Sequence, residues 1–263
     1  MSMLNKQVGS ISVSCIGLGT YGLQRKDMHN VFSEALDCGI NYIDSAYRYG
    51  NEGIIASSFK YMGVNRHDVV IGTKLAYKQQ ISMSVEDAVD ESLRNLQTDY
   101  IDLYFIHSPK SDTYCEDWCR LMLEKQKGKV LELGVSNFNI EQMKDIRNVS
   151  GCYPAINQIE INLGFYPRKI IEFCEEKGIA VQASCPLGRM RQELVNHETM
   201  RTMMNKYHRS YPQLALRWLY QNEILMIPKM SSNSHLMENI SIFDFEIKRE
   251  DMEKLNGEVM SNV

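Results

Sequence analysis

The sequence lacks the features that would place it in a membrane or on nucleic acid. Its 263 residues contain no apolar stretch approaching the ~20 residues that a membrane-spanning helix needs. The first ten residues, MSMLNKQVGS, have no basic segment followed by an apolar one, so we expect no secretory leader. The formal net charge of −4 argues against a nucleic-acid or anionic-membrane partner.

The sequence also lacks the cysteine pattern of a disulfide framework. Its seven cysteines are odd in number and scattered through predicted strands and helices, which is typical of free thiols in a reducing cytosol. Cys115 and Cys119 could share one helix face, but no matching His or Cys pair accompanies them, so we expect no metal site. We therefore expect a cytoplasmic protein of ordinary globular composition, with 44% hydrophobic and 24% charged residues.

Strand and helix signals alternate along the whole chain without a linker or low-complexity break. Eight short apolar runs predict strands at Ser12–Ile16, Ile40–Ile43, Val69–Thr73, Ile101–Ile106, Leu131–Val135, Ala155–Ile159, Ile179–Ala183 and Ile224–Ile227. Helical spacing predicts helices at Met28–Cys38, Glu52–Met62, Ser84–Leu96, Glu116–Gln126, Ile140–Arg147, Arg168–Glu176, Glu198–Gln221 with a break near Ser210–Pro212, Ser234–Ile240 and Arg249–Glu258. Eight strand–helix units in about 250 residues are typical of a (β/α)8 TIM barrel, which we expect as a single domain over residues 1–263.

One glycine-rich segment favours a competing architecture, the doubly wound open sheet. Gly17, Gly19 and Gly22 stand at the first, third and sixth positions of a phosphate-binding turn. However, no helix follows them at once, and no acidic residue takes the ribose-binding place. We therefore expect these glycines to form a tight turn at the mouth of a barrel.

Four polar residues stand at or just past the ends of three predicted strands, namely Asp44, Tyr49, Lys74 and His107. The carboxyl ends of parallel strands open on the same face of a barrel, so these side chains should converge. Taken singly, Asp44 and Lys74 could form a buried structural ion pair, and His107 could be a hydrogen-bonded core histidine. Together, the four favour a proton-transfer site and therefore an enzyme.

The chemistry of these groups suggests a role for each. A Lys74 ammonium held by Asp44 beside a phenol favours the phenolate, so we expect a lowered pKa for Tyr49. Tyr49 could then act as a general acid toward a carbonyl oxygen. His107 would orient that carbonyl or share the proton.

Seven segments resemble the aldo-keto reductase family, in order and over about residues 8–257. They are GLGTYG (17–22), GINYIDSAYRYGNE (39–52), IGTK (71–74), DYIDLYFIH (99–107), GVSNF (134–138), NQIEIN (157–162) and LALRWL with IPK (214–229). The resemblance implies a (β/α)8 barrel that uses NAD(P)H to reduce aldehydes or ketones by hydride transfer. It places the family's catalytic group, called the tetrad below, on Asp44, Tyr49, Lys74 and His107.

The resemblance also implies a cofactor site. Ser136, Asn137 and Gln158 match residues that bind the nicotinamide carboxamide, a task suited to hydroxyl and amide groups. For Asn137 and Gln158, capping and turn formation at strand ends is the alternative. The pyrophosphate loop matches Leu187 and Gly188. Further residues that the resemblance assigns to cofactor contact are Gly19, Thr20, Ser184, Lys229, Ser231, His235, Glu238 and Asn239.

Three departures from the family pattern bear on the substrate. Ser184 stands where many relatives stack an aromatic ring on the nicotinamide, which removes about 1 kcal/mol of contact. Ser108 follows His107 where many relatives carry a tryptophan, and the chain ends soon after its last predicted helix. We therefore expect an open, less apolar pocket and a small, polar carbonyl substrate.

For the cofactor we expect NADPH, with NADH as the alternative. A 2′-phosphate needs cationic or hydrogen-bonding groups nearby, and Lys229 and Ser231 stand in the expected places. However, Met230 replaces a frequent serine, and His235 stands where NADPH-preferring relatives usually have arginine. The expected preference for NADPH is therefore modest.

Two other functions remain open at this stage. The missing ring at Ser184 also suits an epimerase or dehydratase that retains its cofactor. A redox-sensing regulatory subunit would bind cofactor and modulate a partner, although the complete tetrad disfavours it. We expect a monomer that acts on a small-molecule carbonyl compound.

Overall fold

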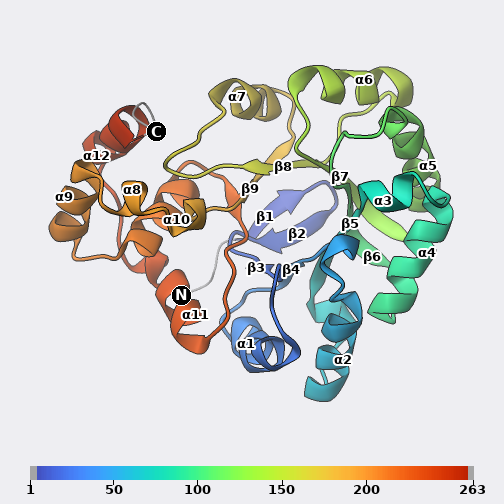
Figure 1. Cartoon of the computed structure of the whole chain (residues 1–263), viewed down its shortest axis with the longest axis horizontal. Helices are drawn as coiled ribbons and strands as arrows, with labels where there is room; N and C mark the ends of the chain where they lie inside the picture. Colours follow the sequence, from blue (N-terminus) through green and yellow to red (C-terminus); the bar gives the residue numbers. More distant parts are fainter. Residues whose placement is uncertain (1–4, 260–263) are drawn as a thin grey trace.

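Eight parallel strands follow one another in chain order in a computed structural model that describes residues 5–259 (Figure 1). They are β3 (Leu18–Gly19), β4 (Tyr42–Asp44), β5 (Val70–Leu75), β6 (Ile101–Ile106), β7 (Val130–Ser136), β8 (Ile156–Glu160), β9 (Ala180–Ser184) and β10 (Leu225–Met226). Each strand pairs with the next one along the chain, without the change of direction that defines a doubly wound sheet. The TIM barrel is confirmed.

The first and last of these strands meet and close the barrel. Ile16 and Gly19 form parallel bridges with Met226 and Lys229. A Cβ atom on Gly19 would lie 2.6 Å from the carbonyl oxygen of Ile227, so only glycine allows this approach. The expected tight turn is therefore wrong for most of the glycine-rich segment, because Gly19 lies in β3. Only Gly22, with a φ of 68°, has a left-handed turn conformation.

The predicted strand at Ser12–Ile16 is wrong as a barrel strand over Ser12–Ser14, and only its last residue, Ile16, bridges to β10. Strand β2 (Ile11–Ser14) instead pairs antiparallel with β1 (Asn5–Val8). The hairpin buries Val8 and Val13 against Tyr42 and Leu103, which lie near the amino-terminal ends of their strands. It therefore covers the end of the barrel opposite the expected site. Apolar alternation is the same in a hairpin and in a barrel strand, so the sequence pattern alone could not separate them.

The main helices surround the barrel, as Figure 1 shows. They are α1 (Arg25–Asp37), α2 (Glu52–Met62), α4 (Val85–Leu96), α5 (Tyr114–Gln126), α6 (Ile140–Ser150), α7 (Arg168–Glu176), α9 (Glu198–Tyr207), α10 (Tyr211–Gln221) and α11 (Asn233–Ile240). Shorter elements are η1 (Tyr47–Tyr49), η2 (Arg66–Asp68), α3 (Tyr77–Gln80), η3 (Gly188–Met190), α8 (Gln192–Val195), η4 (Ser241–Asp244), α12 (Arg249–Lys254) and the π-helical η5 (Leu255–Val259). The predicted break in the long helical region is confirmed, because α9 ends at Tyr207 and Ser210 caps α10.

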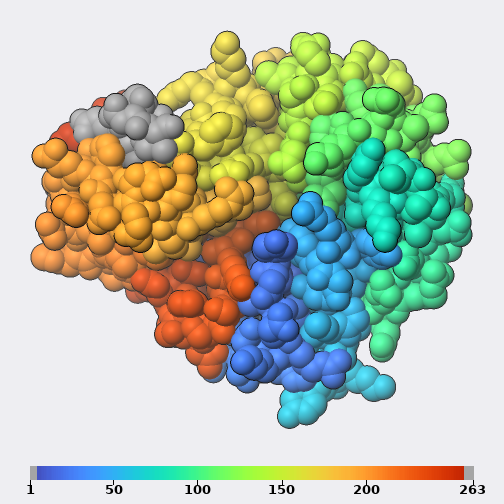
Figure 2. All heavy atoms as spheres, in the orientation of Figure 1, coloured from blue at the N-terminus to red at the C-terminus, as the bar shows by residue number. Residues whose placement is uncertain are grey.

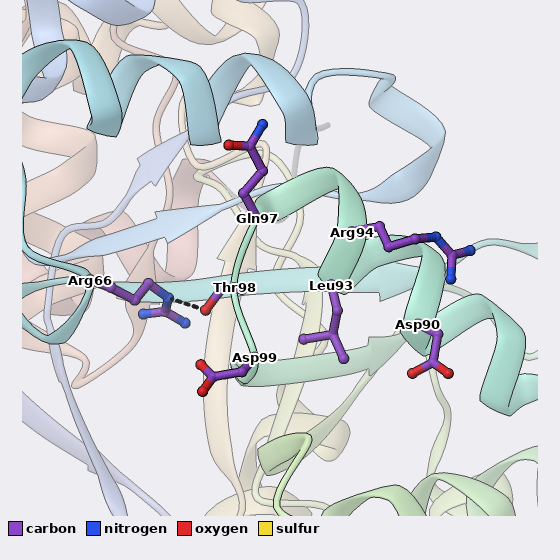
Figure 3. A pocket seen from close by; sticks show the side chains of 7 residues that line it. All are labelled: Arg66, Asp90, Leu93, Arg94, Gln97, Thr98 and Asp99. Atoms are coloured by element: carbon purple, nitrogen blue, oxygen red, sulfur yellow. Dashed lines mark hydrogen bonds between the residues drawn. The ribbon is translucent and has the colours of Figure 1, made fainter.

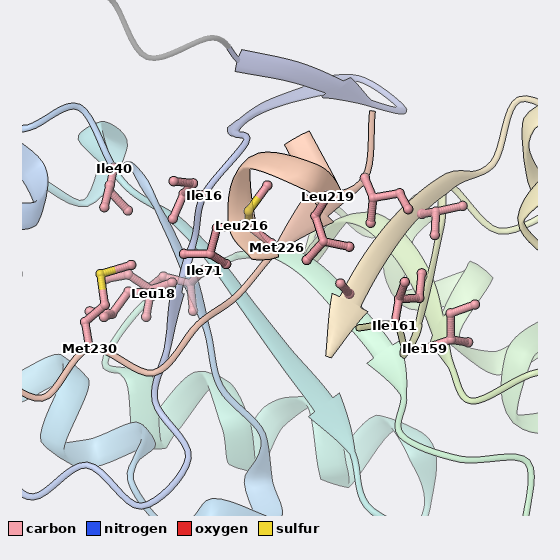
Figure 4. Close-up of a cluster of buried hydrophobic side chains, with 14 of the residues drawn as sticks. Ile16, Leu18, Ile40, Ile71, Ile159, Ile161, Leu216, Leu219, Met226 and Met230 are labelled. Atoms are coloured by element: carbon pink, nitrogen blue, oxygen red, sulfur yellow. The ribbon is translucent and has the colours of Figure 1, made fainter. Parts of the chain in front are cut away.

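The core fills the space between strands and helices with branched aliphatic side chains and methionine (Figure 4). Leu18, Ile71 and Ile161 are at most 1% exposed, and burying each such side chain contributes about 1.5–3 kcal/mol. Met226 and Met230 are fully buried among them, which fits the flexible thioether's use as a gap filler. This core makes the barrel rigid enough to hold side chains at its rim.

The described residues carry seven free cysteines. Between residues 5 and 259, no helix is long and apolar enough to cross a membrane. Over the same range, no group of three or more His, Cys, Asp or Glu side chains could hold a metal ion. The predicted domain limits of 1–263 include residues 1–4 and 260–263, which lie outside the described residues.

Candidate active site

The structure brings the tetrad together at the carboxyl-terminal end of the barrel. Asp44 is the last residue of β4, Lys74 is the second-to-last residue of β5, and His107 directly follows β6. Tyr49 lies in η1, a 3-10 turn between β4 and α2, rather than on the helix itself. Figure 2 shows blue, green and orange segments, from distant parts of the chain, meeting near the centre of the molecule.

Asp44 and Lys74 form a buried ion pair. The Lys74 Nζ atom lies 2.8 Å from both carboxylate oxygens of Asp44 and donates to the Ser45 carbonyl oxygen at 2.6 Å. Lys74 is 0% exposed and Asp44 1% exposed. Burial lowers the pKa of Lys74, while the charge of Asp44 and its hydrogen bonds oppose that shift. The lysine ammonium is therefore held in one place by three oxygen atoms.

A network of buried polar side chains holds the carboxylate in turn. Gln158 Nε2 donates to Asp44 at 2.8 Å and to Gln182 Oε1 at 3.1 Å. The Tyr42 hydroxyl lies 3.4 Å from Asp44 and 3.3 Å from Gln182. Sequence reasoning missed Tyr42 and Gln182, although a glutamine in the middle of an apolar strand was a signal of such a network. Because all these atoms are buried, the network fixes the orientation of Asp44.

The phenol of Tyr49 lies between an imidazole and a second phenol. Its ring centroid is 6.1 Å from that of His107 and 5.0 Å from that of Tyr21, both edge to face. The Lys74 ammonium lies 5.6 Å from the centroid of the Tyr49 ring. The ring of Tyr49 is thus close to both His107 and the Lys74 ammonium, two of the groups that could act with it.

The expected lowering of the Tyr49 pKa is wrong. Burial raises the pKa of Tyr49, the negative charge of Asp44 raises it further, and Arg48 opposes them. The reason is that burial disfavours the phenolate, and Asp44 offsets the charge of Lys74. Tyr49 is therefore protonated at neutral pH and has a proton to donate.

The imidazole of His107 is neutral at physiological pH. Burial, followed by the charges of Lys74, Arg48 and Lys110, lowers the pKa of His107 to about 3. Its backbone N–H donates to the Leu75 carbonyl oxygen at 3.1 Å, which fixes the residue at the end of β6. A neutral imidazole can orient a carbonyl oxygen through its N–H group, so of the two expected roles the structure favours orientation over proton sharing.

His107 should also make the protein sensitive to acid. Unfolded His107 regains its usual pKa of ~6.5, so between pH 6.5 and 3 the unfolded chain binds one more proton than the folded protein. The free energy of unfolding should therefore fall as pH is lowered, by up to ~1.4 kcal/mol per pH unit from this residue. Urea unfolding from pH 7 to pH 4 should show a shallower fall for His107→Gln than for the wild type. The control is His235→Gln, which removes an exposed histidine of α11. Equal slopes in the wild type and in His107→Gln would contradict the prediction.

The side chains assigned to the nicotinamide carboxamide leave hydrogen-bonding groups free. Asn137 has a left-handed φ of 63° and donates from Nδ2 to Ser136 Oγ at 3.0 Å and to the His107 carbonyl oxygen at 3.2 Å. Across residues 5–259, Asn137 Oδ1 and Gln158 Oε1 accept no hydrogen bond, and the Ser136 hydroxyl donates none. A primary carboxamide offers N–H donors and one oxygen acceptor, so these three residues fit it.

Other predicted cofactor residues line the rim near β3 and β9. Thr20 is buried, and its hydroxyl donates to the Asp44 carbonyl oxygen at 3.0 Å, which joins Gly19–Thr20 to the tetrad. Ser184 ends β9, and its hydroxyl forms no hydrogen bond with any described residue. Leu187 directly precedes η3, and Gly188 begins it with a left-handed φ of 56°. Their contact with a cofactor stays a prediction.

The residues predicted to contact adenosine lie after β10 and on α11. Lys229 is exposed, and its Nζ donates to the Gly22 carbonyl oxygen at 3.1 Å. Ser231 Oγ lies 3.3 Å from His235 Nδ1. Glu238 accepts a hydrogen bond from Ser210 Oγ at 2.6 Å, and Asn239 is buried. Lys229 and His235 are therefore exposed, Ser231 and Glu238 are half-buried, and Asn239 is buried.

A hollow of about 650 Å³ lies elsewhere on the surface, beside α4 (Figure 3). It is lined by Arg66, Asp90, Leu93, Arg94, Gln97, Thr98 and Asp99. Asp99 precedes β6, so the hollow lies toward the amino-terminal end of the barrel, away from the tetrad. The guanidinium of Arg66 is occupied by Asp102, Thr98 and the Val69 carbonyl oxygen. This hollow is therefore not part of the candidate site.

Known proteins share both the sequence and the fold. A profile described as the aldo/keto reductase family matches residues 15–258. The glyoxal reductase of Bacillus subtilis (strain 168) is 31% identical over 248 residues, which cover 94% of this chain and 89% of that protein. The crystal structure of an aldo/keto reductase from Brucella melitensis has a TM-score of 0.89 at 31% identity, covering 97% of this chain and 98% of that one. A Gox0644 mutant in complex with NADPH has a TM-score of 0.89 at 29% identity, covering 97% and 93%.

Proposed function

Because this chain belongs to the aldo/keto reductase family and is a carbonyl reductase, we propose that it reduces a small, polar aldehyde or ketone with NADPH and with Tyr49 as proton donor. The observation that carries the proposal is the packing of a protonated Tyr49 against a neutral His107, beside the buried Lys74–Asp44 pair. Such a group can supply a proton to a carbonyl oxygen and stabilise the phenolate that remains.

Each residue of the tetrad has a defined task in this mechanism. NADPH, when bound, supplies the hydride that adds to the carbonyl carbon. The His107 N–H orients the carbonyl oxygen, and Tyr49 donates its proton as negative charge develops there. The Lys74 ammonium, 5.6 Å from the Tyr49 ring centroid, stabilises the resulting phenolate, and Asp44 keeps the ammonium in place.

The chain's own polar groups would hold the nicotinamide. Ser136 would donate to the carboxamide oxygen, while Asn137 Oδ1 and Gln158 Oε1 would accept from its amino group. Gln158 also donates to Asp44 at 2.8 Å, so it would link cofactor position to the tetrad. Ser184 supplies no ring to stack on the nicotinamide, so the orientation of the nicotinamide would depend more on these hydrogen bonds.

The polar rim supports a small, polar substrate. The half-buried Ser108 follows His107, so a hydroxyl lies at that wall of the site. We further propose that the protein acts as a cytoplasmic monomer. Its seven free cysteines, of which Cys119 and Cys152 are exposed, suit a reducing compartment.

Measuring kcat/KM for NADPH and for NADH with glyoxal tests the function and the cofactor. We expect consumption of NADPH with formation of the alcohol, and a preference for NADPH of about tenfold. The reason is that Lys229, Ser231 and His235 could offer the 2′-phosphate a positive charge and hydrogen-bond donors. His235→Arg should increase the preference, because arginine binds phosphate through two N–H groups.

The control variant is His67→Arg, which adds the same charge at an exposed position on η2. Equal or better use of NADH would contradict the cofactor assignment. Failure to oxidise either cofactor with glyoxal and a broad panel of small aldehydes and ketones would contradict the function itself.

A further inference from the structure

Two cations that lie close in the chain to Tyr49 and His107 have no acidic partner. Arg48 directly precedes Tyr49 in η1, and Lys110 lies three residues after His107 on the loop that follows β6. Both side chains are exposed. Within residues 5–259, neither forms an ion pair or a side-chain hydrogen bond, and Asp112 on the same loop as Lys110 forms no ion pair either. Two positive charges are thus free to interact with another molecule.

Their charges act on the reaction centre. After burial and Lys74, Arg48 and Lys110 are the causes of the low pKa of His107, and no carboxylate opposes them. Arg48 also acts against the burial that raises the pKa of Tyr49. Arg48 is the chain neighbour of Tyr49, Lys110 follows His107 by three residues, and the rings of Tyr49 and His107 lie 6.1 Å apart, so both cations belong to the segments that form the reaction centre.

Three other cations near the site are neutralised or belong to the cofactor region, while the exposed Lys78 on α3 forms no ion pair but is not among the charges that lower the pKa of His107. Lys74 is paired with Asp44 at 2.8 Å, and Arg189 lies 3.5 Å from Glu160. Lys229 follows β10, beside the segment predicted to contact adenosine. Arg48 and Lys110 instead follow β4 and β6, which are two and four strands away from β10 in the closed barrel. The uncompensated charges therefore follow the same strands as Tyr49 and His107, and not the strand that precedes the adenosine segment.

We propose that Arg48 and Lys110 form a subsite for an anionic group of the substrate, so that the preferred substrate is an aldehyde or ketone bearing a carboxylate or a phosphate. The subsite rests on the proposed carbonyl reduction at Tyr49 and names its substrate class. Arginine binds either anion through two parallel N–H groups, and lysine adds a point charge. Neutral His107 remains available for the carbonyl oxygen, so the two ends of the substrate contact different residues.

A matched pair of substrates tests the subsite. Succinic semialdehyde carries a carboxylate, and its methyl ester has the same aldehyde without the charge. The wild type should prefer the acid, with a kcat/KM about tenfold or more above that of the ester. Arg48→Met should lower this acid-to-ester ratio about tenfold, Lys110→Met about threefold, and Arg48→Lys should retain most of it. Glyceraldehyde 3-phosphate and glyceraldehyde make the same comparison for phosphate. The substrate pair whose charged-to-uncharged ratio of kcat/KM falls more in Arg48→Met identifies the preferred anion.

The control is Arg147→Met, which removes an exposed arginine from α6, outside the site, and should leave the acid-to-ester ratio unchanged. The subsite would be overturned, and the proposed function left intact, if both substrate pairs are reduced and their charged-to-uncharged ratios of kcat/KM are the same in the wild type and in Arg48→Met. Calorimetric titration with succinate, which cannot be reduced at an aldehyde, tests the subsite without turnover. If no substrate is reduced, the proposed function fails, while succinate binding that Arg48→Met weakens about tenfold supports the subsite. Succinate binding that is absent or unaffected by Arg48→Met overturns it.

Discussion

Tyr49→Phe should lower kcat for carbonyl reduction by at least ~100-fold and leave the affinity for NADPH nearly unchanged. The substitution removes only the hydroxyl. The phenylalanine ring can keep the edge-to-face contacts with His107 and Tyr21, at 6.1 and 5.0 Å between ring centroids. Because burial keeps the wild-type phenol protonated, the lost atom is the proton that the carbonyl oxygen receives. Steady-state kinetics with glyoxal, together with a fluorescence titration of NADPH, measure the two effects separately.

Tyr21→Phe is the matched control for this prediction. Tyr21 is 66% exposed and contacts the Tyr49 ring, but its hydroxyl forms no hydrogen bond with any described residue. Its loss should change kcat by less than about threefold. If Tyr49→Phe retained more than a tenth of wild-type turnover, Tyr49 could not be the proton donor.

Lys74→Met should cause the second large effect, on both rate and stability. Lys74 is fully buried and bonded to both oxygens of Asp44, so its removal leaves a buried carboxylate without a counter-charge. Breaking a buried pair in this way costs about 3–5 kcal/mol of unfolding free energy. The activity should fall at least ~100-fold, because no cation then stabilises the Tyr49 phenolate. Urea unfolding and kcat at pH 7 measure both quantities.

The double variant Asp44→Asn/Lys74→Met separates the two roles of the pair. Removal of both charges should restore most of the lost stability, because no uncompensated charge remains buried, but it should not restore the rate. Lys125→Met is the control, since it breaks a pair with Glu132 outside the tetrad in which the lysine side chain is 39% exposed. It should cost less stability than Lys74→Met and leave kcat unchanged. Full activity in Lys74→Met would show that the Asp44–Lys74 pair serves the fold alone.

Much of this fold could be predicted from the sequence because its signals are local. The spacing of apolar residues in α4 and the Ser84 cap, which accepts a hydrogen bond from the Asp87 N–H, depend on residues close in the chain. The convergence of Asp44, Lys74 and His107 could also be expected, because parallel strands present their carboxyl ends on one face. The resemblance to a family added the assignment of roles, which local patterns do not contain.

Other features depended on which distant segments meet, and only the tertiary structure decided them. The first predicted strand became a hairpin because Val8 and Val13 pack on Tyr42 and Leu103, which no local period reveals. The pKa of Tyr49 rises rather than falls, because the free energy of burying a phenolate depends on every group packed around it. Arg48 and Lys110 are two charges among many in the sequence, and their lack of an acidic partner is known only from the residues that surround them. The sequence by itself determined the order of the elements and the chemistry available at the strand ends. The closed barrel decided which of those groups are desolvated, paired or free, because desolvation and pairing depend on distances between atoms far apart in the chain.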